Sequence, residues 1–412
     1  MADEPAFVRA DARPAPVPSY AAVLRIPGAR RAFGAALVGR LSYGTVALSL
    51  LLAVKAGTGS YAVAGTVMAL FGATSVFLSP ARAALVDRYG LRRALPPMVA
   101  VYATLLVGIA AATWRPGASG VWLGAAVAAA GACTPPVGPV MRALWSELAP
   151  DRELLQRAYS LDGVAEEIVL AFGPLLVGVL VGLAPAATGV LVSAGLISVG
   201  TLALVSSPAV GRSAARAEAA VPDGVRHPAP ARTGLWRAVV AAAGVGLCLG
   251  GIDLLAVAFA DRRGHAAAVA WILAALSIGS AVGGLTYGAI RWRVAADRRL
   301  PLLALGLGLS LAAAGLSPNL YVLAAAAAVT GLFVAPTITT AYLSADACAT
   351  ANTRTRVGAW VNTALNAGAS TGTATTGLLI GRVPLPLIFA VAALPTLFAA
   401  ATITIRPAPP ES

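Results

Sequence analysis

The stretch AYSLDGVAEEIVLAFGPLLVG, residues 158–178, predicts a single helix that spans a membrane. It carries three carboxyl groups, on Asp162, Glu166 and Glu167, followed by a Gly173–Pro174 step. A charged side chain inside a bilayer costs at least about 2.5 kcal/mol, so such residues are rare and usually functional. Three of them in one span point to the handling of protons or ions during transport.

The composition of the whole chain indicates an integral membrane protein. Of its 412 residues, 58% are hydrophobic and 11% are charged, whereas a soluble domain carries about 25% charged residues. The net charge is +13, but the basic residues occur in short clusters between apolar runs. That distribution is typical of loops on the cytoplasmic side of a membrane, and we exclude nucleic acid as a partner.

The sequence offers no disulfide framework and no metal site. Its three cysteines, Cys133, Cys248 and Cys348, lie in or at the end of apolar runs without C-x-x-C spacing. The two histidines fall in predicted loops, and no ATP-binding motif of the form G-x-x-x-x-G-K-S/T occurs. We predict a protein that is not an enzyme, uses no cofactor and draws on a proton gradient. The N-terminus lacks the layout of a cleaved signal peptide, so we expect the first span to be retained.

Apolar runs of about 20 residues predict twelve membrane-spanning helices. They cover residues 32–54, 61–80, 96–113, 121–145, 158–183, 186–206, 236–259, 267–290, 301–317, 320–344, 357–381 and 385–405. The polar segment 207–235 separates six spans from six. We therefore predict an all-α membrane protein of two six-helix bundles, at 32–206 and 236–405, with tails at 1–31 and 406–412.

The basic residues fix the predicted orientation. Of the 30 basic residues, 24 fall in predicted inner segments and five in predicted outer loops. Positive charge gathers on the cytoplasmic side, so both termini and the central loop are predicted to be cytoplasmic. The high content of Ala, Gly and Arg is typical of high-GC bacteria, so we expect a location in a bacterial cytoplasmic membrane. We also expect the protein to be a monomer.

The two halves resemble each other at a constant offset of 200 residues. Gly131 and Pro136 match Gly331 and Pro336, and the predicted spans align at the same offset. Asp162 and Glu166 fall opposite Asn362 and Asn366. Parallel repeats of this kind are a recurring plan of transporters, with the substrate site near mid-membrane between the halves.

The loop after the second span, residues 83–93, reads AALVDRYGLRR. It resembles the G-x-L-x-D-R-x-G-R-R/K-x signature of the major facilitator superfamily, with Ala83 in place of the first glycine and Leu91 in place of a basic residue. In that superfamily the loop is a cytoplasmic latch. The resemblance implies this role for Asp87, Arg88, Gly90, Arg92 and Arg93. We add Arg142, near the cytoplasmic end of span four, as an interfacial anchor or as a partner of Asp162 or Asp87.

Residues 173–178 resemble a second signature, the G-P-x-x-G-G of drug:proton antiporters in the same superfamily. Gly173, Pro174 and Gly178 match it, whereas Val177 replaces one glycine and Val169 stands where the longer pattern has another. Glycine and proline allow a span to kink and a neighbouring helix to approach closely. The resemblance implies a twelve-span antiporter-like exporter.

The buried charges allow two interpretations. Arg40 and Glu166 lie at nearly the same depth, roughly 13 Å from the cytoplasmic edge, so they are predicted to pair if spans one and five are neighbours. Glu167 is turned by about 100° from Glu166 and is the candidate for an unpaired acid that titrates. Asp162 is shallow enough to belong to the latch. Either Glu166 or Glu167 couples transport to protons, or the ion pair only fixes the packing of two spans.

Four further residues are candidates for the cavity and the substrate: Asp253, Tyr43, Asn362 and Asn366. Each has an ordinary alternative. Asp253 is equally suited to a gate with Arg262 or Arg263, the asparagines to polar contacts between helices, and Tyr43 to an interfacial aromatic belt.

The sequence thus predicts a secondary transporter that works by alternating access, with protons and a small molecule as its partners. Proton-coupled export of a small amphipathic compound, a drug or natural product, is the favoured function. An importer or facilitator of a sugar or similar nutrient is the nearest alternative. A membrane-embedded enzyme would need an acid, base or nucleophile cluster near an interface, which the sequence lacks. A sensor that binds a ligand without transporting it stays open.

Overall fold

The computed structural model describes residues 19–212, 232–265 and 268–405. Most of the predicted N-terminal tail, most of the central loop and the C-terminal tail lie outside these ranges. Every element in the described part of the chain is a helix. The predicted all-helical fold class is therefore confirmed.

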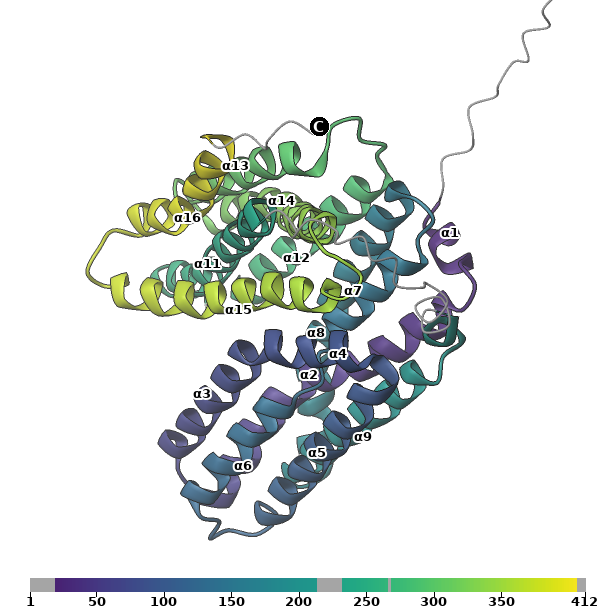
Figure 1. Ribbon diagram of the computed structural model, residues 1–412. Coiled ribbons are helices and arrows are strands. Elements are labelled where there is room, and N and C mark those ends of the chain that lie inside the picture. Colours follow the sequence, from purple (N-terminus) through teal and green to yellow (C-terminus); the bar gives the residue numbers. More distant parts are fainter. Residues whose placement is uncertain (1–18, 213–231, 266–267, 406–412) are drawn as a thin grey trace, which may run out of the picture.

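The N-terminal half contains the helices α1 to α9 (Figure 1). They are α1 (Tyr20–Arg25), α2 (Ala29–Thr58), α3 (Tyr61–Phe77), α4 (Ser79–Tyr89), α5 (Leu91–Ala112), α6 (Gly120–Cys133), α7 (Val137–Leu148), α8 (Arg152–Leu183) and α9 (Ala187–Val205). The C-terminal half contains α11 (Arg232–Arg262), α12 (Ala268–Ala289), α13 (Ala296–Ala314), α14 (Leu320–Ala347), α15 (Arg354–Leu379) and α16 (Leu385–Ile405).

Without the short α1, these helices form twelve spans when α3 with α4 and α6 with α7 are each counted as one. Nine segments in the described ranges, with α6 and α7 counted as one, are long and apolar enough to cross a membrane, and α3 with α4, bent by 41°, makes a tenth. The remaining two spans are α13, whose first turn is charged, and α15, which is rich in threonine and asparagine. Polar residues in α15 are consistent with a span that faces a cavity rather than lipid.

Two spans of the N-terminal half are broken, whereas their counterparts in the C-terminal half are continuous. Pro135 and Pro136 separate α6 from α7, because proline lacks the backbone N–H that a helix needs. The equivalent α14 has a single proline, Pro336, and runs on for 28 residues. The break between α3 and α4 lies at Leu78, two residues before Pro80, and α12 has no such break.

Close glycine contacts set the packing of α2 against α8. A methyl group added to Gly173 would overlap the backbone of Gly44, so the two helices approach at the distance that only glycine permits. The predicted close approach at Gly173 is thus observed. A methyl group on Gly178 would meet open space.

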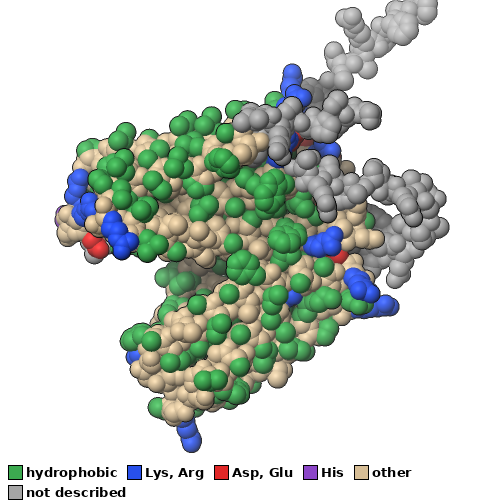
Figure 2. All heavy atoms as spheres, turned by 60° about the vertical axis from the view of Figure 1, so that its left-hand side comes forward, with side chains coloured by type: hydrophobic (Ala, Val, Ile, Leu, Met, Phe, Trp, Pro, Cys, Tyr) green, Lys and Arg blue, Asp and Glu red, His purple; other side chains and the backbone are tan. Residues whose placement is uncertain are grey.

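The two bundles meet at one end and splay apart at the other (Figure 1). At the closed end α15 packs on α4 and α7, and α8 packs on α12 and α14. At the other end α3 and α15 diverge, and the space-filling view shows a hollow between the halves (Figure 2). The molecule is therefore in a state that is open on one side only.

Candidate functional site

Four charged side chains form one cluster in the N-terminal half. Arg40 of α2 lies 3.0 Å from Asp162 of α8, measured between Nη1 and Oδ1. Arg142 of α7 lies 3.1 Å from the same carboxylate, between Nε and Oδ2, and also pairs with Glu166. Asp162 is thus shared by two arginines, and Arg142 by two acids.

The cluster is buried except at one member. Arg40 and Asp162 are 1% and 0% exposed, whereas the Glu166 side chain is 25% exposed. Two arginines and two ionised acids carry no net charge together, which lowers the cost of burying each of them. Loss or gain of a single proton would unbalance the group, and Glu166 is the member that solvent reaches.

A contact across the two halves places the cluster close to the axis that relates them. Arg142 donates a hydrogen bond of 2.8 Å to the Tyr342 hydroxyl of α14, and its guanidinium stacks 4.1 Å from the centre of that ring. Arg142 and Tyr342 are 200 residues apart, which is the offset of the repeat. Residues at equivalent positions of two halves touch each other only near their axis. The cluster therefore occupies the centre of the molecule.

Glu167 points away from Glu166, as the 100° turn between them predicts, and it contacts the other half. Its Oε1 accepts a hydrogen bond of 2.6 Å from Ser280 of α12. Its Oε2 is buried without a hydrogen-bond partner in the described structure. Because the two arginines are already balanced by Asp162 and Glu166, Glu167 is an additional acid, and no ion pair to a described residue compensates it.

Arg82 of α4 holds the two helix breaks of the N-terminal half together. Its Nη1 donates to the carbonyl oxygens of Gly131 and Ala132, at 2.8 and 3.1 Å, in the last turn of α6. Nη1 and Nη2 also reach Thr74 and Ser75, in the last turn of α3. The last carbonyls of a helix lack partners within it and carry partial negative charge. A guanidinium that is 6% exposed thus serves as a fixed cation for both helix ends.

Replacing Arg82 by alanine is expected to destabilise the protein and to create a site for free guanidinium. The carbonyl groups would stay buried without donors, at about 1–3 kcal/mol each. We expect a lower melting temperature for purified Arg82→Ala, partly restored by millimolar guanidinium chloride but not by sodium chloride. An unchanged melting temperature, or equal stabilisation of the wild type by guanidinium, would contradict this role.

Tyr43 of α2 serves the same break from the opposite side. Its hydroxyl donates to the carbonyl of Pro135 and accepts a hydrogen bond of 3.1 Å from the backbone N–H of Val137. The hydroxyl therefore bridges the end of α6 and the start of α7. The sequence favours Tyr43 as a cavity residue, whereas in the structure its polar atom binds the backbone.

The last turn of α4 meets the N-terminus of α15 at the closed end. The two carboxylate oxygens of Asp87 accept hydrogen bonds from the backbone N–H groups of Thr355 and Arg356, at 3.1 and 2.8 Å. The N-terminus of a helix has unpaired N–H groups and a positive dipole end, so it binds an anion well. Thr363, two turns further along α15, donates to the carbonyl of Val76 at 3.0 Å.

Replacing Asp87 by alanine is expected to loosen the closed end about fivefold, because a lost helix cap costs about 1 kcal/mol. A cysteine at Ser160, which is 1% exposed there, would report the change in a background whose native cysteines are serine. We expect Asp87→Ala to speed its alkylation by a polar maleimide, and the exposed Asp261→Ala to leave it unchanged. Equal rates for both variants would contradict the latch.

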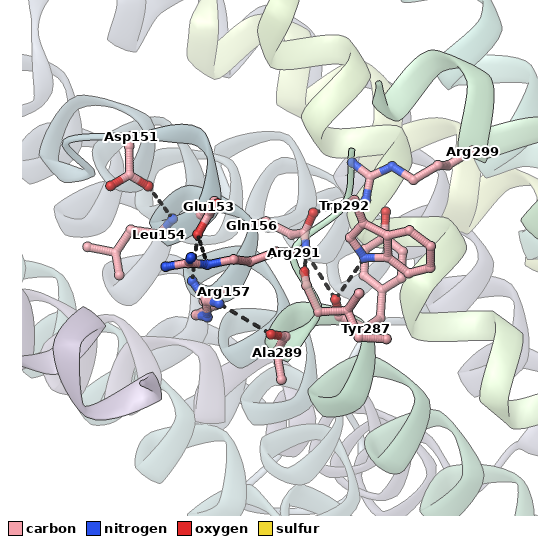
Figure 3. Close-up of polar contacts among 11 residues, drawn as sticks. Asp151, Glu153, Leu154, Gln156, Arg157, Tyr287, Ala289, Arg291, Trp292 and Arg299 are labelled. Atoms are coloured by element: carbon pink, nitrogen blue, oxygen red, sulfur yellow. Dashed lines mark hydrogen bonds and ion pairs between the residues drawn. The ribbon is translucent and has the colours of Figure 1, made fainter. Parts of the chain in front are cut away.

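A second set of contacts closes the same end between α8 and the C-terminus of α12 (Figure 3). Gln156 and Arg157 of α8 donate to the carbonyls of Tyr287 and Ala289, at 2.9 and 3.2 Å. Arg291 pairs with Glu153 at 3.0 Å. Here donors of α8 meet the negative end of α12, whereas at the first contact an acid of α4 meets the positive end of α15.

Arg299 and Tyr20 extend this second contact. Arg299 of α13 donates to Gln156 at 3.0 Å and stacks on the rings of Tyr287 and Trp292. Tyr20 of α1 donates to the carbonyl of Leu285, so α1 reaches across from the N-terminal half to α12. Burial raises the pKa of the Tyr20 hydroxyl to about 12, and it keeps the proton that it donates.

The comparison with protein families decides the identity of the fold. A family model described as Major Facilitator Superfamily matches residues 32–293. The chain belongs to the major facilitator superfamily. It is therefore a membrane transporter rather than an enzyme. No curated protein sequence matches the chain.

Solved structures of superfamily transporters share this fold at low sequence identity. A bacterial homologue of the iron transporter ferroportin in an outward-facing state has a TM-score of 0.72 at 12% identity, covering 92% of this chain and 99% of that one. The human organic anion transporter MFSD10 has a TM-score of 0.70 at 15% identity, covering 91% and 99%. The Escherichia coli fucose:proton symporter has a TM-score of 0.60 at 14% identity, covering 91% and 98%.

Three sequence predictions for this transporter need correction. Arg40 pairs with Asp162 rather than with Glu166. Asp162 is fully buried in the central cluster and does not belong to the latch, because α8 begins at Arg152, six residues before the predicted start. Arg142 lies in the cluster rather than in the latch, whereas its predicted pairing with Asp162 is confirmed. The predicted cytoplasmic ends of spans four and five lie too close to Arg142 and Asp162, so the predicted depths of these residues in the membrane are too small.

Other predicted site residues lie apart from the cluster. Asp253 is exposed on α11, one turn beyond Gly250, which packs on Ala369 of α15. Asn366 is exposed and donates to the carbonyl of Asn362. In the latch loop Gly90 has a φ of 78°, and Arg88 stacks on its neighbour Tyr89. Arg92 approaches Gly211 instead of α15, and the backbone N–H of Arg93 donates to the carbonyl of Gly90 at 3.3 Å.

Sequence reasoning missed Arg82, Ser280, Tyr342 and the second closing contact. Arg82 had a visible signal, since it is an arginine in an apolar run between Pro80 and the latch motif. Tyr342 could have been found from the 200-residue offset to Arg142. Ser280 and Gln156 carry no such signal, because an uncharged polar residue is common in membrane helices.

Proposed function

We propose that this superfamily member is a proton-coupled exporter of a small amphipathic compound. The observation that carries the proposal is the charge-balanced cluster at the centre, in which solvent reaches Glu166. Beside the cluster, Glu167 contacts the other half of the molecule. We further propose that the closed end faces the cytoplasm of a bacterium, because the basic loops gather there. The described state is then outward-facing.

The charges supply a coupling mechanism. A proton from outside neutralises Glu166. Arg142 then loses one of its two ion pairs and is held less firmly at the cavity. A second proton site is Glu167, whose charge has no cation of its own. When Glu167 is neutral, its hydrogen bond from Ser280 is no longer charge-assisted, so α8 and α12 separate at lower cost. Release of the protons inside restores the charges of the cluster, and the protein then returns to the outward-facing state with cargo bound.

Two further observations support export of an amphipathic compound. Gly173 and Gly44 allow α2 and α8 to pack closely where the antiporter-type motif lies. Hydrophobic side chains are visible at the back of the hollow between the halves (Figure 2). Asp253 and Asn366, both exposed on helices of the C-terminal half, are the proposed polar contacts for the cargo.

The proposal is tested by toxin resistance in an efflux-deficient bacterial host. Cells that express the wild type are expected to tolerate at least one amphipathic compound of a panel, and Glu166→Gln is expected to abolish that protection. Asp261→Asn, an exposed acid near the end of α11, is the matched control. Resistance that is unchanged in Glu166→Gln would refute the role of this acid.

The nearest alternative is an importer of a sugar or similar nutrient, and the fold shared with a fucose:proton symporter is compatible with it. An importer would sensitise cells to toxic analogues of its cargo instead of protecting them. If the expressing cells became more sensitive to compounds of the same panel, import would be the function and export would be refuted.

A further inference from the structure

Two adjoining cavities lie beside α2 and α9, at the end of the molecule where the bundles meet. The first, of about 420 Å³, is bounded by Arg31, Gly34, Ala35 and Val38 of α2 and by residues 199–208. The second, of about 300 Å³, is bounded by residues 24–31 together with Pro208 and Arg212. Arg31 and Pro208 belong to both, so the two cavities form one continuous groove.

The second cavity is strongly basic. Arg25, Arg30, Arg31 and Arg212 line it, and no acidic residue is among its lining residues. None of the four forms an ion pair with a residue in the described ranges. The start of α2 adds the positive end of a helix dipole to the same place. The cavity is therefore suited to an anion with more than one oxygen.

The first cavity is apolar and runs along the span. From Arg31 to Val38 it extends about 10 Å along α2, which corresponds to the step from the headgroup level into the hydrocarbon. Val38 and Val199 are 39% and 64% exposed on its walls. A side chain added to Gly34 would meet no atom within 4 Å, so the groove is open there.

We propose that this groove binds one phospholipid with an anionic headgroup. The phosphate lies among the four arginines, and an acyl chain lies between α2 and α9 along Gly34 and Val38. A free phosphate ion would use only the basic cavity, and a lipid without net charge would gain little from it. Basic pockets between membrane helices are a recurring basis of anionic lipid recognition. The inference is independent of the transported compound and of proton coupling.

The ligand has a structural consequence for the transport site. It would join α2, the α1–α2 link and the segment after α9 at one point. α2 also carries Arg40, nine residues beyond Arg31, in the central cluster. A bound lipid would thus fix the helix that holds one of the four central charges.

The test uses the full-length protein in detergent, with phosphatidylglycerol, phosphatidylcholine or inorganic phosphate added. Retained lipid is counted by native mass spectrometry, and the melting temperature is measured in parallel. We expect phosphatidylglycerol alone to be retained at one per protein and to raise the melting temperature. Arg31→Gln with Arg212→Gln is expected to weaken binding roughly 30-fold, since each basic residue near an anionic surface contributes about a factor of five.

Matched variants separate the two parts of the groove. Gly34→Leu fills the apolar part and is expected to reduce lipid retention while the arginines stay in place. Arg293→Gln with Arg298→Gln removes two exposed charges elsewhere, Gly65→Leu adds a side chain in open space on α3, and both are expected to bind normally. Stabilisation by inorganic phosphate alone, or equal retention by phosphatidylcholine, would overturn the proposal. So would unchanged retention in the Arg31 and Arg212 variant.

Discussion

Replacing Asp162 by asparagine is expected to destabilise the protein by about 3–5 kcal/mol and to abolish transport. Asp162 is fully buried and is the only acid that contacts Arg40 in the described structure. Removing one partner of a buried ion pair leaves an uncompensated charge, which is why the cost exceeds that of removing the whole pair. The measurement is the melting temperature of the purified protein, followed by the resistance assay.

A double variant distinguishes this charge effect from a general loss of packing. Arg40→Met together with Asp162→Asn removes one positive and one negative charge and leaves Arg142 paired with Glu166. We expect this double variant to recover much of the lost stability while transport stays impaired. The loss of unfolding free energy in the double variant could instead equal the sum of the losses in the two single variants. In that case the balance of charge would not be what stabilises the cluster.

Replacing Glu167 by glutamine is expected to preserve the fold but to uncouple transport from protons. The glutamine oxygen still accepts the hydrogen bond of Ser280, so the contact between α8 and α12 is retained. The side chain can no longer bind and release a proton. We expect uphill accumulation of cargo to fall more than tenfold, whereas downhill flux persists.

Ser280→Ala is the matched control for Glu167→Gln. It removes the hydrogen bond but leaves the carboxyl group, so coupling should persist with an altered pH dependence. If Ser280→Ala abolished accumulation as completely as Glu167→Gln, the contact between the halves, and not the proton, would be the essential feature.

The number of spans and the division into two halves could be predicted because both depend on the composition of long segments. The twelve apolar runs, the polar segment after the sixth run and the repeat offset are each detected over many residues. The same averages hide the breaks within spans. The run 121–145 is apolar apart from Thr134 and Arg142, and only the pair Pro135–Pro136 reveals that α6 ends and α7 begins inside it.

The partners of the central charges could be predicted only in part. Sequence indicates which residues are charged and roughly how deep they lie, but a pairing depends on side-chain reach and on helix rotation within a few ångströms. The depth of Asp162 was wrong because amphipathic residues before residue 158 extend α8 into the closed end. The separation of Glu166 from Glu167 was predictable, since the 100° turn between neighbours in a helix does not depend on the ends of the span.

The opposite polarity of the two closing contacts was not predictable from the latch motif. Asp87 caps the start of α15, whereas the equivalent position in the second half is Tyr287, whose hydroxyl bonds to Thr340 instead. The second closing contact is supplied from α8 by Gln156 and Arg157, which belong to no motif that we recognised.

The central claim, proton-coupled export through the charge cluster, is tested most directly in inside-out membrane vesicles. The probe is a compound to which the wild-type protein confers resistance. Vesicles that contain the wild type and an acidic interior are expected to accumulate it, and collapse of the pH gradient is expected to stop accumulation, as Glu167→Gln does. Accumulation that persists after the gradient has collapsed would contradict the account.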